Sequence, residues 1–324
     1  MSHPVLPTVL PTVLVADIGG TNTRVALVHH GKLDHASIRR TANAGQPSLG
    51  PILAAYLKDE GVARVDGASV AAAGPVTDGI AELTNLDWRI TPDEVRQATG
   101  AAHVAILNDL QAQGHALDHL APDAFRPVLP GAGTPRRGAR LVIGVGTGFN
   151  AAPVHRTRAG LYVAPSECGH ASLPVQGREE AAMATEIARA HGFAGVEDVL
   201  SGRGLERLAA LCSGGTQRPA AEVMAALAAG EANAVRTGRL FQTLLGRVVG
   251  DLALTHLPFQ GIFLIGGVAR AFTPYLTDGA FAAAFRDKGR FSAFMDDFAV
   301  HLVEDDYAAL AGCAAYLNQE KRHD

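Results

Sequence analysis

Three segments of the 324-residue sequence place glycines directly after an apolar run that could form a strand. They are Asp17–Arg24 (DIGGTNTR), Gly144–Gly148 (GVGTG) and the pair Gly266-Gly267. Glycine leaves backbone N–H groups open to an anion, and threonine adds a hydroxyl donor. One such turn can serve a tight hairpin and nothing else, but three of them together favour the binding of phosphate groups.

Asp17 adds a carboxylate to the first of these turns. A carboxylate beside bound phosphate can hold Mg²⁺, usually through water. The second turn lies roughly 130 residues further on, about one domain length away. Two phosphate turns in two domains predict a nucleotide bound in the cleft between the domains. The P-loop motif is absent, since Gly31-Lys32 is followed by Leu33, and the protein-kinase and G-x-S-x-G motifs are absent as well.

Further polar residues could contact a substrate. Asn108-Asp109 follow an expected strand, where open α/β sheets place ligands, although either residue could instead cap the next helix. Glu167 and His170 could bind a metal with Cys168, but a zinc site needs further ligands and no second cluster is near in the sequence, so a polar surface loop is the simpler alternative. Glu197 alone reads as an exposed acid at a helix start.

The elements that must position these residues alternate between strands and helices, which predicts an α/β fold. Buried strands are expected at 13–18 and 24–29, which form a hairpin, and at 68–73, 102–107, 139–143 and 261–265. Helices are expected at 49–57, 110–120, 179–191, 204–211, 220–229, 233–256 and 307–317. The length favours two domains, with a boundary at the start of the Pro-, Gly- and Arg-containing stretch 121–138.

Composition excludes several classes of function. The formal net charge is −4 and no basic run exceeds two residues, so neither nucleic acid nor an anionic membrane is expected as a partner. No apolar stretch is long enough for a membrane span, and the first residues lack the features of a signal peptide. Three cysteines without a CxxC pair argue against a disulfide framework. We therefore expect a cytoplasmic protein.

The motifs together resemble a known family. The segments Asp17–Arg24, Gly144–Gly148 and Ile262–Val268 are similar to the first phosphate, second phosphate and adenosine motifs of the sugar kinase, heat-shock-protein-70 and actin superfamily. Within it the chain resembles the bacterial ATP-dependent glucokinases, through Asn108-Asp109, Glu167–His170 (ECGH), Val199–Gly202 (VLSG) and Phe285–Phe291 (FRDKGRF). The resemblance runs from about Val13 to Leu317.

This resemblance implies a two-domain actin-like ATPase (ribonuclease-H-like) fold with an interdomain cleft. The small domain would comprise residues 1–119 with about 312–324, and the large domain 120–311. It implies transfer of the γ-phosphate of ATP to the 6-hydroxyl of D-glucose, with Mg²⁺ held by Asp17, and a homodimer. Asp109 would be the catalytic base, and glucose would be bound by Asn108, Asp109, Glu167, His170 and Glu197. ATP would contact Ala16, Asp17, Ile18, Gly19, Gly20, Thr21, Gly144, Gly146, Thr147, Gly148, Gly266 and Gly267.

Some positions depart from the family pattern. Cys168 and Arg203 stand where glycine and proline are usual, and Phe149-Asn150 where Leu-Gly is usual. The segment Thr84–Trp88 resembles the family's cleft loop, although a lone tryptophan is by default a packing residue. Two other functions stay open: a kinase for another hexose, such as mannose or an amino sugar, and a sugar-sensing protein of the same fold without catalysis.

Overall fold

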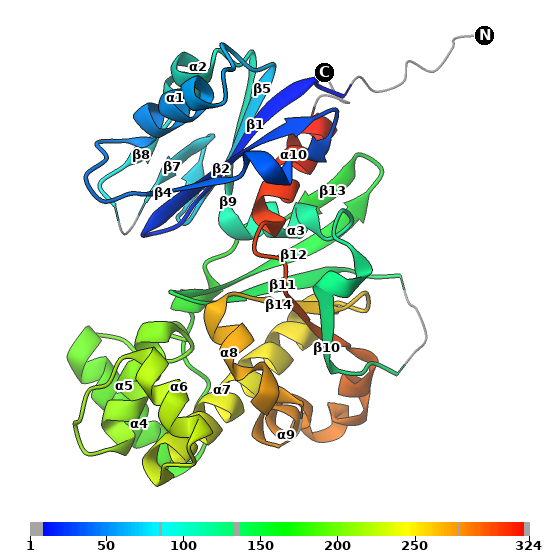
Figure 1. Ribbon diagram of the computed structural model, residues 1–324. Coiled ribbons are helices and arrows are strands. Elements are labelled where there is room, and N and C mark those ends of the chain that lie inside the picture. Colours follow the sequence, from blue (N-terminus) through cyan, green and yellow to red (C-terminus); the bar gives the residue numbers. More distant parts are fainter. Residues whose placement is uncertain (1–8, 84–85, 133–136, 278, 321–324) are drawn as a thin grey trace. The chain divides into compact units, whose positions relative to one another are not determined.

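The computed structural model describes residues 9–83, 86–132, 137–277 and 279–320 (Figure 1). Thr84 and Asn85 of the predicted cleft loop lie outside the described residues. Two compact units divide the chain. Unit 1 comprises residues 1–121, 156–163 and 305–324, and unit 2 comprises 122–155 and 164–304. Compactness alone does not show which parts fold as separate domains, so the predicted domain limits stay a prediction.

Unit 1 is built on a mixed sheet that begins with a hairpin. Its strands are β1 (Thr12–Ile18), β2 (Asn22–His29), β3 (Lys32–Leu33), β4 (Arg39–Ala42), β5 (Gly67–Ala72) and β9 (His103–Asn108). The order is β3-β2-β1-β5-β9, and β4 also pairs with β2. β1 and β2 are antiparallel, whereas β1, β5 and β9 are parallel. A small antiparallel sheet joins β6 (Val76–Thr77), β7 (Ile80–Glu82) and β8 (Arg89–Ile90).

Alternate residues of β1 face two different hydrophobic layers, as the two-residue period of a strand requires. Leu14 packs with the core that includes helices α1 (Leu49–Asp59) and α2 (Pro92–Thr99). Val13 and Val15 pack with the core that includes α3 (Asp109–Ala116) and α10 (Ala308–Glu320). The last helix of the chain therefore covers a sheet formed by the first strands. Trp88 is buried in the first of these cores, so it packs in unit 1.

Unit 2 contains most of a second sheet that repeats the hairpin-then-parallel arrangement. Its strands are β10 (Phe125–Leu129), β11 (Arg140–Val145), β12 (Phe149–Thr157), β13 (Gly160–Val163), β14 (Ile262–Ile265) and β15 (Val300–Val303), in the order β10-β15-β14-β11-β12-β13. β11 and β12 are antiparallel, whereas β11, β14 and β15 are parallel. The end of β12 and all of β13 belong to unit 1.

Helices supply much of the unit 2 core. They are α4 (Gly177–His191), α5 (Gly202–Cys212), α6 (Ala220–Ala228), α7 (Ala232–His256), α8 (Gly267–Leu276) and α9 (Ala280–Arg286). The central helix α7 packs against α5, α6 and α9. Phe241 of α7 stacks on Phe272 of α8 with the ring centroids 4.3 Å apart, and both side chains are fully buried.

The structure confirms the strands and helices that the sequence predicted, with ends that differ by a few residues. Hydrophobic periodicity missed the helices α2, α8 and α9 and the strands β3, β4, β6, β7, β8, β10, β12, β13 and β15. These elements are short or lie next to glycine turns, where periodicity is weak. Among the described residues, no helix is both long and apolar enough to cross a membrane.

Candidate active site

The first phosphate turn connects β1 to β2 in unit 1. Gly19 N–H donates to the Asn22 carbonyl at 3.0 Å, and the Asn43 side chain donates to the Gly19 carbonyl at 2.7 Å. These bonds hold the turn from both sides. Ala16 and Ile18, two of the predicted ATP contacts, have fully buried side chains, so only their backbone could reach a nucleotide.

Asp17 lies beside this turn with an arginine partner. Arg24 Nη1 donates to Asp17 Oδ2 at 2.9 Å. Burial raises the pKa of the Asp17 carboxyl, and the Arg24 charge opposes that rise. Within the described residues Oδ1 accepts no hydrogen bond, so one carboxylate oxygen suits a water-mediated contact with Mg²⁺. No group of three or more His, Cys, Asp or Glu side chains that could hold a metal occurs in the described part of the chain.

Asn108 and Asp109 follow β9 at the same edge of the sheet as the first phosphate turn. The parallel register aligns Ile18, Ala72 and Asn108 across β1, β5 and β9. Two strand spacings of about 4.8 Å place the end of β9 roughly 10 Å from the end of β1. Asp109 therefore lies near the predicted phosphate turn, at the carboxyl end of parallel strands.

The alternative capping role of Asn108 is confirmed. Asn108 Oδ1 accepts from Leu110 N–H at 3.0 Å, and Gln111 Oε1 accepts from Asn108 N–H at 3.2 Å, which completes a capping box at the start of α3. Asn108 Nδ2 also donates to the Gly74 carbonyl at 3.0 Å. Asn108 thus holds α3 in place, directly before the predicted catalytic Asp109.

In unit 2 the second and third glycine turns converge. Gly202 N–H, at the start of α5, donates to the Gly146 carbonyl at 2.8 Å. Gly266 has a φ of 108°, and a Cβ there would lie 2.5 Å from the Val145 carbonyl oxygen. Gly144–Gly148 and Gly266-Gly267 are therefore adjacent, and glycine is required for the close approach at Gly266.

The same turn also contacts Glu197, a predicted sugar ligand. Phe149 N–H donates to Glu197 Oε2 at 2.9 Å, and a Cβ on Gly148 would lie 2.5 Å from that oxygen. Glu197 N–H in turn donates to the Gly169 carbonyl at 2.8 Å. The expectation that Glu197 is a helix-start acid is wrong, because it lies in a turn before α5.

Glu167 and His170 lie close to Glu197. Burial is the main cause that raises the pKa of Glu167, the Glu197 charge adds to the rise, and His170 opposes it. A Cβ on Gly169 would lie 2.0 Å from the Phe149 carbonyl oxygen, so this segment is pressed against the start of β12. Unit 2 therefore brings Glu167, His170 and Glu197 together beside the second phosphate turn.

Asn150 fastens this loop, a role that the sequence analysis missed. Its Oδ1 accepts from the backbone N–H groups of Ala151 at 2.8 Å and Cys168 at 3.2 Å, and its Nδ2 donates to the Ser166 carbonyl. Burial raises the pKa of the Cys168 thiol, whose Sγ lies 3.5 Å from Asn150 Oδ1. The two departures from the family pattern, Asn150 and Cys168, are thus in contact with each other. The available signal was a polar residue two positions after the last glycine of a glycine turn.

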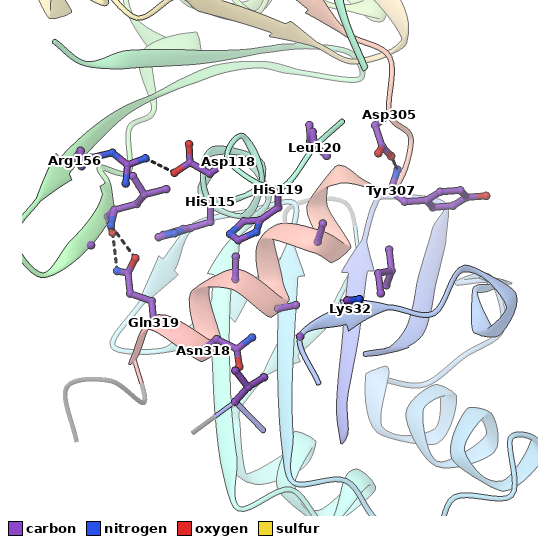
Figure 2. A pocket seen from close by; sticks show the side chains of 18 of the residues that line it. Lys32, His115, Asp118, His119, Leu120, Arg156, Asp305, Tyr307, Asn318 and Gln319 are labelled. Carbon is purple, nitrogen blue, oxygen red and sulfur yellow. Dashed lines mark hydrogen bonds and ion pairs between the residues drawn. The ribbon is translucent and has the colours of Figure 1, made fainter. Parts of the chain in front are cut away.

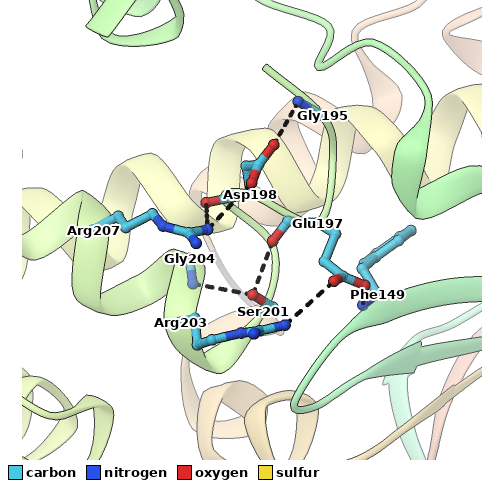
Figure 3. Close-up of polar contacts among 8 residues, drawn as sticks. All are labelled: Phe149, Gly195, Glu197, Asp198, Ser201, Arg203, Gly204 and Arg207. Atoms are coloured by element: carbon cyan, nitrogen blue, oxygen red, sulfur yellow. Dashed lines mark hydrogen bonds and ion pairs between the residues drawn. The ribbon is translucent and has the colours of Figure 1, made fainter. Parts of the chain in front are cut away.

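A polar network leads from Glu197 to α5 (Figure 3). Ser201 Oγ donates to the Glu197 carbonyl at 2.8 Å and accepts from Gly204 N–H at 3.0 Å, as the N-cap of α5. Arg203 Nη2 lies 3.6 Å from Glu197 Oε1 and forms an ion pair with it. The third departure, Arg203, therefore touches a predicted sugar ligand directly.

Known proteins show the family to which this chain belongs. The family model "Glucokinase" matches residues 14–320. A glucokinase of Caulobacter vibrioides is 34% identical over 320 residues, which is 95% of this chain and 96% of that protein. The chain belongs to the glucokinase family. It is accordingly an ATP-dependent hexose kinase, with glucose as the family's sugar.

Solved glucokinase structures have a fold similar to that of this glucokinase family member. The crystal structure of glucokinase from an Antarctic psychrotroph has a TM-score of 0.81 and 30% identity, and the match covers 95% of this chain and 98% of that chain. A glucokinase from Balamuthia mandrillaris, solved in complex with glucose, has a TM-score of 0.79 and 22% identity, with 95% and 94% covered. The predicted two-domain actin-like ATPase fold is confirmed.

Proposed function

We propose that this chain transfers the γ-phosphate of ATP to the 6-hydroxyl of D-glucose through the site residues described above. The observation that carries this assignment is the contact of Glu197 with the second phosphate turn at Gly148 and Phe149. One short segment thereby links a group suited to sugar hydroxyls with a turn suited to phosphate. The glucose bound to the Balamuthia mandrillaris relative supports the choice of sugar.

Asp109 acts as the base in this proposal. Its carboxylate accepts the proton of the 6-hydroxyl as the oxygen attacks the γ-phosphorus and the bond to the β-phosphate oxygen breaks, which gives glucose 6-phosphate and ADP. Phosphoryl transfer depends mostly on positioning and on stabilisation of charge, so an ordinary carboxylate suffices. Asp109 is fixed at the start of α3 by the Asn108 cap and by its own contact with Leu110 N–H at 2.8 Å.

The other residues bind and orient. Glu167, His170 and Glu197 present two carboxylates and an imidazole to the sugar hydroxyls, which need both donors and acceptors. Backbone N–H groups of Gly20 and Thr21 in the first turn and of Thr147 and Gly148 in the second bind the ATP phosphates, and Gly266-Gly267 lie at the adenosine. Asp17 would hold Mg²⁺ through water, and the bound ion would neutralise phosphate charge.

We also propose that the protein is a homodimer and that it is located in the cytoplasm. Light scattering would test the oligomeric state, and cell fractionation would test the location.

The experiment measures ADP formation from Mg²⁺-ATP with glucose, mannose, fructose, N-acetylglucosamine or no sugar. Turnover on glucose well above the other sugars is expected. Asp109→Ala should lower kcat about 10²–10⁴-fold while glucose binding is partly kept. Asp59→Ala, an exposed aspartate at the end of α1, is the matched control and should leave kcat unchanged. Rapid turnover by Asp109→Ala would refute the assignment of Asp109 as the catalytic base. If the folded wild-type protein turned over no hexose, a sugar-sensing role would be favoured instead.

A further inference from the structure

Unit 1 contains a cavity of about 870 Å³ that none of the predicted site residues lines (Figure 2). Its lining comes from the β2–β3 connection and the 3₁₀ turn that follows, the end of α3, the β12–β13 turn and α10. Its polar lining includes Lys32, His35, His119, Arg158 and Asn318. A volume of this size is in the range of small-molecule binding sites.

One wall of the cavity is fixed by specific contacts. Gln319 of α10 bonds both to the N–H and to the carbonyl of Leu161, each at 2.8 Å. Gly160 has a φ of 110°, and a Cβ there would lie 2.5 Å from the Gln319 side chain, so the close approach requires glycine. Arg156 and Asp118 form an ion pair across the same region, visible in Figure 2. The two hydrogen bonds of Gln319 and the close approach at Gly160 thus hold the β12–β13 turn against α10.

The lining carries unneutralised positive charge. Its charged residues are Lys32, Arg156 and Arg158 against Asp118 and Asp305. Asp118 pairs with Arg156, whereas Lys32 and Arg158 form no ion pair with any residue that the structure describes. Cations without partners around a concave site favour an anionic ligand, and lysine and arginine both bind phosphate.

Other polar groups lie among these cations. The imidazoles of His35 and His119 line the cavity and can donate N–H groups to a phosphate oxygen. Asn318 Oδ1 is shielded from solvent and accepts no hydrogen bond within the described residues. A buried carbonyl oxygen without a hydrogen-bond donor is unfavourable, and a ligand hydroxyl could satisfy it.

We propose that this cavity binds a small phosphomonoester that also carries a hydroxyl group. Lys32 and Arg158 contact the phosphate, and Asn318 accepts from the hydroxyl. The cavity is lined by Ala121, Arg156 and Asp305, which stand at three of the four points where the chain passes between unit 1 and unit 2. Bound ligand therefore contacts the connecting segments, and we expect it to change the apparent KM for glucose; this kinetic part depends on the proposed function.

The binding test uses 3-phosphoglycerate as the probe and the full chain in isothermal titration calorimetry at constant ionic strength. We expect saturable binding, weakened at least 10-fold in Lys32→Ser/Arg158→Ser. The matched control Lys58→Ser/Arg89→Ser removes the same charge from two exposed unit 1 residues outside the cavity and should bind like the wild type. Absence of saturable binding, or equal weakening in both double variants, would overturn the proposal.

Two further measurements separate this site from the reaction site. Ala315→Phe fills part of the cavity without a change of charge and should also weaken binding at least 10-fold. Saturating glucose with a non-hydrolysable ATP analogue should leave the probe bound, and displacement by them would place the probe in the reaction site instead.

The kinetic part is tested by the glucose KM. A shift of the glucose KM by the probe should vanish in Lys32→Ser/Arg158→Ser. Binding without such a shift would overturn the kinetic part alone, and the calorimetry needs no kinase activity.

Discussion

Gly148→Ala should weaken glucose binding while the protein stays folded. The added Cβ would lie 2.5 Å from Glu197 Oε2, which is closer than real contacts allow. Gly148 has no positive φ, so alanine fits its backbone. The atom that must move is the end of a flexible side chain, so the free energy of unfolding should change little. The carboxylate, however, must leave the place where Phe149 N–H holds it.

The size of the effect follows from that hydrogen bond. A bond to a charged acceptor contributes about 1.5–3 kcal/mol, and Phe149 N–H lies 2.9 Å from the carboxylate oxygen. If glucose binds only when Glu197 occupies this position, the dissociation constant for glucose should rise by about 10- to 150-fold, since about 1.4 kcal/mol corresponds to tenfold.

Calorimetric titration with glucose in the absence of nucleotide measures this effect apart from any change in ATP binding. Gly146→Ala is the matched control in the same turn, because a Cβ there meets no described atom closer than 3.9 Å. A Glu197→Ala variant completes a double-mutant cycle. In that background Gly148→Ala should add little, because the side chain that it displaces is already absent.

Three results would contradict this reasoning. One is wild-type affinity of Gly148→Ala for glucose, which would mean that Glu197 does not bind the sugar from this position. Another is that Gly146→Ala weakens glucose binding as much as Gly148→Ala does, which would mean that a change in the turn itself lowers the affinity. The last is full additivity of Gly148→Ala and Glu197→Ala, because independent effects cannot arise from one displaced carboxylate.

Three other outcomes are expected. Arg203→Gln should change the glucose dissociation constant less than about fivefold in the same titration, because its ion pair with the half-buried Glu197 is long, at 3.6 Å, and Arg203 itself is exposed, and such pairs contribute about 0.2–1 kcal/mol. Burial lowers the pKa of His115 from 6.5 to about 4. As the pH falls, the unfolded chain therefore takes up this proton first, and the free energy of unfolding should drop by up to about 3 kcal/mol between pH 6.5 and pH 4. Urea unfolding of His115→Gln should show a smaller drop over the same pH range. Gly312→Ala should lower the free energy of unfolding by about 3 kcal/mol, since its Cβ would lie 1.7 Å from the Ala112 carbonyl oxygen, and a wild-type urea midpoint would contradict this.

Local sequence determined the elements that carry the site. The apolar runs before Gly19, Gly144 and Gly266 predict strands that end in glycine turns, and the structure has β1, β11 and β14 there. Local rules suffice because a strand's side-chain period and the small size of glycine act within a few residues. The capping role of Asn108 was also visible, since amide side chains favour helix N-caps.

Only the tertiary structure decided how distant segments meet. Nothing near Glu197 in sequence shows that its carboxylate accepts from Phe149, 48 residues away, or that Asn150 fastens the loop at Cys168. The same holds for Gln319, which fixes the β12–β13 turn in unit 1 across 158 residues. Such contacts depend on strand register and on how helices pack over the sheets, and both are set by burial of the whole core. The sequence alone therefore determined which chemical groups are available, and packing decided which of them act together.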